Sequence, residues 1–145
     1  MIYNTTPLYN YQFVSVQVNS PQSRYFFPDL PNLRDAKTYC ISAYNSDFLP
    51  NDINNVPCVN FNDFNECFIT LYANGREIFQ RLDLLYFCTI IGYNPLSNAK
   101  GQFGGALPLD YLKIDYSKSF IEFPSGAAPT TATPFVFPFG IYYIK

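Results

Sequence analysis

The sequence predicts an all-β fold, namely an antiparallel β-sandwich of jelly-roll or Greek-key type with long loops. Apolar and polar residues alternate in several short segments of the 145-residue chain, as they do in strands that bury one face. Turn-forming residues separate these segments, and no segment keeps a helical period for more than about two turns. About seven or eight such strands with long connections favour a jelly roll or Greek key over a meander. We expect one domain over residues 1–145, with an N-terminal arm over about residues 1–10.

The first two strands follow from alternation and from the turns that end them. Residues 11–18 alternate, so Val14, Val16 and Val18 share one face of the expected strand. A short strand is expected over residues 24–27, because a turn that contains two prolines follows it directly.

A third strand is expected over residues 38–44, where the alternation returns. This pattern places Tyr39, Ile41 and Ala43 on one side of the strand. Residues 45–57 carry Pro, Asn and Asp throughout and are therefore expected to form a loop.

The strongest local signal is Asn74-Gly75, which lies between two strand-like segments. A two-residue hairpin loop of type I′ needs positive φ at both central residues, and Asn and Gly adopt that conformation most readily. A hairpin without bulges would bring Leu71 and Ile78 together on the core face. The pairs expected for it are Ala73 with Arg76, Tyr72 with Glu77, Leu71 with Ile78, Ile69 with Gln80 and Phe68 with Arg81.

The second half of the chain contains two long connections between its strand-like segments. Residues 84–91 are apolar, and their period does not distinguish a strand from a short helix. Residues 92–108 contain several glycines and two prolines and are expected to form a long irregular loop. A strand is expected over residues 119–123, followed by a connection rich in Pro, Ala and Thr over residues 124–134.

The last expected strand covers residues 135–144. Pro138 and Gly140 interrupt it, which favours either an edge position or a bulge, since proline cannot donate to a strand ladder. One side of this strand should carry Phe135, Phe137, Phe139 and Ile141.

The composition points to a protein that makes contacts rather than to an enzyme. The chain has 13 Tyr and 15 Phe, but only 9 basic and 11 acidic residues and no His. Buried interfaces are rich in aromatic and poor in charged residues, and the lack of His removes the usual general base and the commonest metal ligand. The basic residues are scattered, so direct binding of nucleic acid is not expected. The longest apolar segment is also far too short to span a membrane.

No known catalytic or metal-binding pattern is present in the sequence, so we expect no cofactor, no metal site and no enzymatic activity. Asp110 and Asp115 are the nearest approach to a glycosidase carboxylate pair, but solvated loop charges are the better interpretation. Asp52, Asp63 and Glu66 lack the spacing of a calcium loop. The cysteines form no Cys-x-x-Cys pair and are interpreted as small apolar residues in a reducing compartment; they are Cys40, Cys58, Cys67 and Cys88.

Aromatic residues near both ends of the chain are the candidate interface residues. Terminal segments can reach a neighbouring subunit, and tyrosine suits a protein interface because its ring is apolar and its hydroxyl finds a partner. The alternative is ordinary packing of the terminal strands onto the sandwich. The candidates are Tyr3, Tyr9, Tyr11, Tyr142 and Tyr143, together with Phe103 at the tip of the glycine-rich loop.

The segments 24–34 and 37–44, Ile69 to Glu77 and the aromatic last strand together resemble small virion proteins of tailed bacteriophages. The similarity is greatest to the auxiliary, or decoration, capsid proteins of crAss-like phages. It implies a β-sandwich without enzymatic activity that binds the major capsid protein, other virion proteins or itself. The expected location is then the virion, assembled in the host cytoplasm. A carbohydrate- or receptor-binding module of a phage fibre or tail is the alternative.

Overall fold

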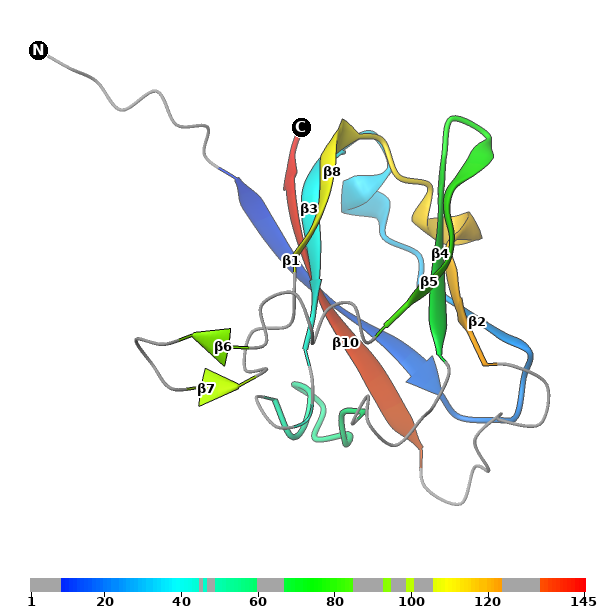
Figure 1. The fold of residues 1–145 in the computed structure, drawn as a ribbon, viewed down its shortest axis with the longest axis vertical. Coiled ribbons are helices and arrows are strands. Elements are labelled where there is room, and N and C mark those ends of the chain that lie inside the picture. The colour runs from blue at the N-terminus through cyan, green and yellow to red at the C-terminus, as the bar shows by residue number, and fades with distance from the viewer. Residues whose placement is uncertain are drawn as a thin grey trace, which may run out of the picture.

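Two antiparallel sheets of four strands each face one another in the computed structural model of the chain (Figure 1). The predicted all-β sandwich is thereby confirmed. The structure describes residues 9–44, 46, 49–59, 67–84, 93–94, 99–100, 106–123 and 134–145.

Consecutive strands alternate between the sheets, except for the hairpin β4–β5 and the small pair β6–β7. This is the strand order of a jelly roll. Sheet A consists, in spatial order, of β1 (Asn10–Val18), β10 (Phe135–Ile144), β3 (Lys37–Ala43) and β8 (Ala106–Leu112). Sheet B consists of β2 (Arg24–Phe26), β9 (Phe120–Glu122), β4 (Phe68–Ala73) and β5 (Arg76–Asp83). The other elements are the short 3-10 helices η1 (Pro31–Leu33) and η3 (Tyr116–Lys118) and the pair of β6 (Tyr93–Asn94) with β7 (Ala99–Lys100).

The core lies between the sheets and is lined by one face of each. The predicted alternation of β1 is confirmed, because Val14, Val16 and Val18 are all buried. Sheet B contributes large side chains such as Ile69 and Leu71, which are fully buried. The side chains of β10 that we expected to share one side are Phe135, Phe137, Phe139 and Ile141, and the last three are fully buried in this core.

Strand β10 lies between β1 and β3, so the predicted alternative of an edge position is wrong. Proline is tolerated there because the carbonyl of Pro138 accepts a hydrogen bond from the Tyr44 N–H at 3.0 Å, just beyond the end of β3. The N–H and C=O of one strand residue point to the same side. The side of Pro138 that lacks an N–H therefore faces the end of β3, where the ladder stops. No hydrogen bond between β10 and β1 is lost. The other predicted alternative, a bulge in β10, is not observed either, because β10 pairs with β1 residue for residue. The register shift beside Tyr142 and Tyr143 comes from an extra residue in β3.

The prediction that Tyr39 lies on the same side as Ile41 and Ala43 is wrong. Ile41 and Ala43 are buried, whereas Tyr39 is 40% exposed. The register of β3 shifts at this residue against both of its neighbours, because Cys40 pairs with Tyr142 and Thr38 with Tyr143. Tyr39 is thus an extra residue in the ladder, and its side chain turns to the outer face.

The predicted turn at Asn74 and Gly75 is confirmed, with φ of 56° and 75°. The expected pairs Ala73 with Arg76 and Tyr72 with Glu77 also form. The rest of the expected register is wrong, because two shifts displace β5. Near these shifts, Arg81 has a positive φ of 52°. Its N–H donates a hydrogen bond to the Thr70 hydroxyl at 3.2 Å. The observed pairs are Leu71 with Phe79, Ile69 with Leu82 and Phe68 with Asp83.

Replacing Gly75 with valine should lower the free energy of unfolding by about 1–2 kcal/mol, since a β-branched residue is strained at positive φ. A Cβ at this position would meet no other atom within 4 Å, so the cost is conformational and not steric. The midpoint of urea unfolding measures it. Gly75→Asn is the control, because Asn tolerates this conformation and should retain most of the stability. Equal midpoints for the wild type and the valine variant would contradict this prediction.

The expected irregular loop over residues 92–108 is wrong in two places, because β6 and β7 pair with each other inside it and β8 begins at Ala106. This strand was not predicted because Pro108 and the preceding glycines disfavour a strand, although buried Leu107 and Leu109 do alternate with exposed Pro108 and Asp110. Strand β9 confirms the strand expected over residues 119–123. The expectations for residues 85–91 and 124–133 lie outside the described residues. In the described part of the chain, no helix has the length and apolar character that a membrane span requires.

Candidate functional site: the aromatic face of sheet A

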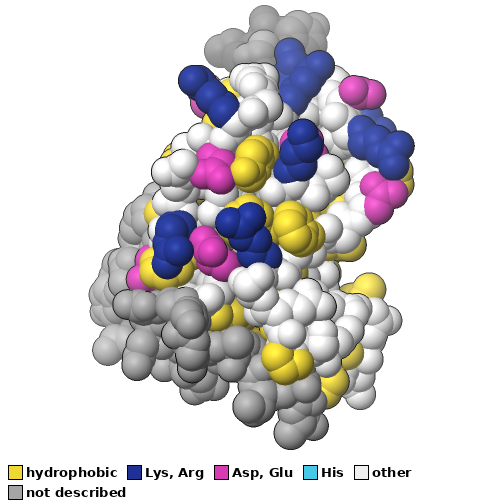
Figure 2. Space-filling model, turned by 90° about the vertical axis from the view of Figure 1, so that its right-hand side faces the viewer, with side chains coloured by type: hydrophobic (Ala, Val, Ile, Leu, Met, Phe, Trp, Pro, Cys, Tyr) yellow, Lys and Arg dark blue, Asp and Glu magenta, His cyan; other side chains and the backbone are white. Residues whose placement is uncertain are grey.

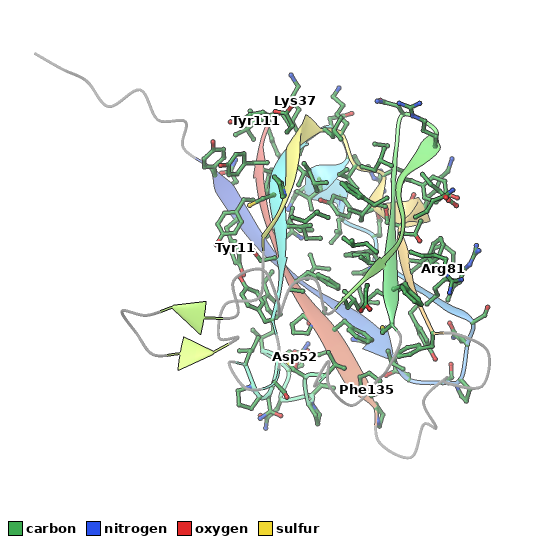
Figure 3. All side chains as sticks on the ribbon, in the orientation of Figure 1. Tyr11, Lys37, Asp52, Arg81, Tyr111 and Phe135 are labelled. Atoms are coloured by element: carbon green, nitrogen blue, oxygen red, sulfur yellow. The ribbon has the colours of Figure 1, made fainter. Side chains whose placement is uncertain are left out.

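Aromatic side chains gather on the outer face of sheet A, which is the face turned away from the core. Figure 3 shows two of them, Tyr11 and Tyr111, on the side of the molecule away from Arg81 of sheet B. The rings come from all four strands of the sheet or from residues directly beside them, and they form two clusters. We call this surface the aromatic face; its members are Tyr9, Tyr11, Phe13, Tyr39, Tyr44, Tyr111 and Tyr142.

Three tyrosines form one half of the aromatic face. Tyr9 stacks on Tyr39 with 4.5 Å between the ring centroids and an interplanar angle of 18°. Tyr39 also packs against Tyr111 at 5.6 Å. The hydroxyls of Tyr9 and Tyr111 are hydrogen-bonded at 2.9 Å, which closes the cluster. Each of the three side chains is therefore fixed by the other two.

Backbone irregularities place this cluster on the surface. Opposite the extra residue Tyr39, strand β8 has additional residues of its own between its pairs with Cys40 and Thr38. Two of these, Asp110 and Tyr111, have positive φ of 49° and 61°. For a bulky residue such as tyrosine this conformation is strained, at a cost of about 1–3 kcal/mol. Such strain is concentrated at functional sites, so it marks this end of the aromatic face as a candidate binding surface.

The other half of the aromatic face lies over Gly140. Tyr11 packs against Tyr142 at 5.0 Å, and its hydroxyl is bonded to that of Tyr44 at 3.0 Å. Phe13 stacks with Tyr44 at 6.3 Å. A Cβ on Gly140 would lie 2.5 Å from the Tyr44 hydroxyl and 2.7 Å from a ring carbon of Tyr11. Only glycine therefore allows both rings to lie down on the sheet.

Three tyrosine hydroxyls of this face, those of Tyr9, Tyr11 and Tyr44, have a raised pKa. The hydrogen bond to Tyr111 raises the pKa of Tyr9 from 10.0 to about 12. Burial, and then the hydrogen bond with Tyr11, raise the pKa of Tyr44. Burial also raises the pKa of Tyr11. These three hydroxyls are thus neutral at physiological pH.

The free energy of unfolding should fall as the pH rises from about 10 to about 12, the ordinary and the raised pKa of Tyr9. In this window the unfolded chain has released tyrosine protons that the folded chain keeps, so rising pH favours unfolding. Urea unfolding at a series of pH values measures the slope. Tyr9→Phe should make the slope shallower, because it removes one of the groups with a raised pKa. An unchanged slope in that variant would contradict the assignment.

The outer face of sheet B has a different character. Figure 2 shows basic and acidic side chains interspersed on this side of the molecule. The guanidinium of Arg81 lies 4.6 Å from the centroid of the Phe68 ring and 3.7 Å from the Glu122 carboxylate. That of Arg24 lies 4.2 Å from the centroid of Phe120. Cations thus cover the aromatic rings here, whereas β1 and β10, which carry half of the aromatic face, contain no charged residue.

The structure brings three of the predicted interface residues together. Tyr9, Tyr11 and Tyr142 all belong to the aromatic face, and Tyr11 is 45% exposed. Tyr143 does not join them, because it alternates with the buried Ile141 along β10 and its side chain lies in the core, 8% exposed. Tyr3 and Phe103 lie outside the described residues.

Four members of the aromatic face were not among the residues predicted from the sequence. Phe13 could have been found, since it alternates with the buried valines of β1 and so lies on the outer side. The others depend on bulges or on strand neighbours that the sequence does not specify; they are Tyr39, Tyr44 and Tyr111.

A hollow of about 470 Å³ between η1 and η3 is a weaker candidate site. Side chains of both charges line it, but several are paired with one another. Arg34 contacts Asp29 at 3.2 Å, and the Ser117 hydroxyl donates to the Asp115 carboxylate at 2.6 Å. The salt bridge between Arg34 and Asp29 is exposed to solvent, and such salt bridges contribute little to folding stability.

The remaining chemistry-bearing groups have structural surroundings. Asp52 is buried, and its carboxylate accepts the N–H groups of Asn54 and Val56, both at 2.9 Å, which fixes the loop. Cys58 and Cys67 are buried free thiols, and Cys40 is a half-buried one. Burial raises the pKa of Cys58 to about 11, which keeps this thiol protonated. The described residues contain no group of three or more Cys, Asp or Glu side chains that could hold a metal ion.

The fold and the candidate site together define a jelly-roll β-sandwich with an aromatic outer face on one sheet. Comparison with protein families, curated proteins and solved structures finds no significant match to the chain.

Proposed function

We propose that this protein is a non-enzymatic structural subunit that binds another protein through the aromatic face. The observation that carries the proposal is the gathering of seven aromatic side chains outside the core, in two clusters that lie on or directly beside the four strands of sheet A. The resemblance of the sequence suggests the setting, which is a virion. The partner would then be the major capsid protein or another virion protein.

The chemistry of the face suits a protein partner. Each buried aromatic side chain removes about 150–250 Å² of surface from water. The hydrogen bonds Tyr9–Tyr111 and Tyr11–Tyr44 hold the rings in place before the partner arrives, so less side-chain freedom is lost on binding. Neutral hydroxyls at the ring tips can still exchange hydrogen bonds with polar groups of the partner.

The topology supports the proposal only by analogy. Jelly rolls occur in viral capsid proteins and in lectins, which bind sugars. A shared fold does not establish a function, so the argument depends on the aromatic face and not on the strand order.

Binding of a carbohydrate is the second candidate, and the exposed end of the aromatic face favours it. Tyr39 and Tyr11 offer exposed rings on which a sugar could stack. The exposed carboxylate of Asp110, next to Tyr111, could accept hydrogen bonds from sugar hydroxyls.

A double variant, Tyr11→Ser with Tyr39→Ser, tests the proposal. It removes the two most exposed rings of the face and leaves the core untouched. We expect binding to the major capsid protein or to purified particles to weaken by about 100-fold, since aromatic anchors dominate interfaces. The matched control is Phe26→Ser, which removes a 51% exposed ring from the side of sheet B and should bind as the wild type does.

Co-sedimentation with purified particles measures the protein partner, and a glycan array with the same variants measures sugars. Incorporation of the double variant at the wild-type level would refute the proposal. Retention of specific glycans by the wild type, lost in the double variant and without binding to particles, would establish the second candidate instead.

A further inference from the structure

The four edge strands of the sandwich differ in how well they are protected against pairing with another strand. Natural edges are protected by shortness, charge, proline or bulges. Strand β2 has only three residues and begins with Arg24. Strand β5 carries four charged residues and two register shifts. Strand β8 contains Pro108, Asp110 and a bulge.

Strand β1 has none of these protections. It is nine residues long, it contains neither a charged residue nor a proline, and all nine residues pair with β10 without a register shift. Among the residues that the structure describes, no strand pairs with its other side. A long, uncharged and regular edge of this kind is a template for a further strand.

The partner strand β10 determines which backbone groups of β1 face outward. The C=O of Pro138 points to β3, since it accepts the Tyr44 N–H. Ser15 is the residue opposite Pro138, so its own N–H and C=O point away from β10. Backbone direction alternates along a strand, so the N–H and C=O groups at the free edge are those of Tyr11, Phe13, Ser15 and Gln17.

We propose that β1 pairs with β1 of a second copy of this chain, antiparallel and about a two-fold axis at Val14. In this register Ser15 of each copy faces Phe13 of the other copy, and Gln17 of each copy faces Tyr11 of the other. Every outward N–H and C=O group of the two strands then finds a partner. No other two-fold register pairs all four outward-facing residues of each strand.

The pairing also agrees with the two faces of the sheet. Residues that face one another across the axis are both odd-numbered or both even-numbered, so core faces meet core faces. Because β1 has no charged residue, no like charges meet across the axis. The two aromatic faces would become one continuous surface on an eight-stranded sheet. This inference concerns the edge of sheet A and holds whether or not the aromatic face binds the partner proposed above.

The test compares Ser15→Pro with Ser15→Ala in the full chain by sedimentation equilibrium. Both variants lose the weak contact of the hydroxyl with Asp52 at 3.4 Å, but only proline removes the outward N–H. Proline is tolerated at a sheet edge, so the fold should survive. We expect the wild type and Ser15→Ala to be dimers. Ser15→Pro should raise the dissociation constant at least about tenfold, since two hydrogen bonds are lost per dimer. A monomeric wild type, or an unchanged dimer in Ser15→Pro, would overturn the inference.

A second pair of variants tests the register even if proline disturbs the fold. Phe13→Lys with Ser15→Lys places two lysines opposite each other at each side of the axis, and Phe13→Lys with Ser15→Glu places a lysine opposite a glutamate. We expect the first to be monomeric and the second to be dimeric at low salt. Equal association of the two double variants would refute the register. Particle binding separates the two proposals, because it depends on Tyr11 and Tyr39 and dimerisation depends on Ser15.

Discussion

Replacing Phe139 with alanine is expected to lower the free energy of unfolding by about 3–5 kcal/mol, because it removes a large side chain from the centre of the core. Phe139 lies on β10 in the middle of sheet A and is fully buried. Its ring packs against Phe27 with 5.2 Å between the centroids. A domain has only about 5–15 kcal/mol of stability in total, so this variant should lose a large part of it.

Phe26→Ala is the matched control, since it deletes the same side chain from the outer face of sheet B. Phe26 is 51% exposed. Among the described residues, the one aromatic ring that it contacts is that of Phe120. Loss of this ring should lower the free energy of unfolding by less than about 1.5 kcal/mol. Urea unfolding followed by circular dichroism measures both variants. Similar losses for Phe139 and Phe26 would contradict the assignment of the core to the space between the sheets.

Local signals in the sequence predicted the parts of the fold that depend on neighbouring residues. The Asn74-Gly75 turn is specified by its own backbone requirement, and it forms with both φ angles positive. The burial of alternate residues in β1 follows from the pattern of its valines. The all-β class follows from many such segments taken together.

Strand neighbours could not be predicted in this way. Pro138 favours an edge when β10 is considered alone, but the identity and the end of the adjacent strand decide whether a ladder hydrogen bond is lost. Here β3 ends at Ala43, beside the proline, and this makes a central position possible. Likewise, the bulge at Tyr39 depends on the pairing of β3 with two strands from the second half of the chain.

The candidate site was predicted in part for the same reason. Tyr9, Tyr11 and Tyr142 were found because they lie near the ends of an aromatic-rich chain. Their partners are distant in the sequence; the Tyr9–Tyr111 hydrogen bond, for example, joins residues 102 positions apart. Composition therefore indicated an aromatic surface, and the three-dimensional pairing of the strands decides which aromatic residues form it.

Gly140 allows one half of the aromatic face to form, so replacing it with valine should have the second large effect. The new side chain would enter space held by Tyr11 and Tyr44, whose nearest atoms lie 2.5–2.8 Å from the position of a Cβ. Both rings would have to leave the sheet, and their mutual hydrogen bond would break. We expect a loss of about 3 kcal/mol in the free energy of unfolding, as is typical of overpacking, and weaker binding of the partner.

A double-mutant cycle shows whether the rings are the cause of that loss. In a background that carries Tyr11→Ala and Tyr44→Phe, the atoms that crowd Gly140 are gone. Gly140→Ala should destabilise the wild-type protein. In the double-variant background the same change should stabilise the protein by about 0.5–1 kcal/mol, since alanine loses less backbone entropy than glycine on folding into a strand. The sign of the effect therefore reverses if the glycine is required by the two tyrosines. An equal loss in both backgrounds would mean that the backbone of β10 itself requires glycine, and that the tyrosines lie over it without depending on it.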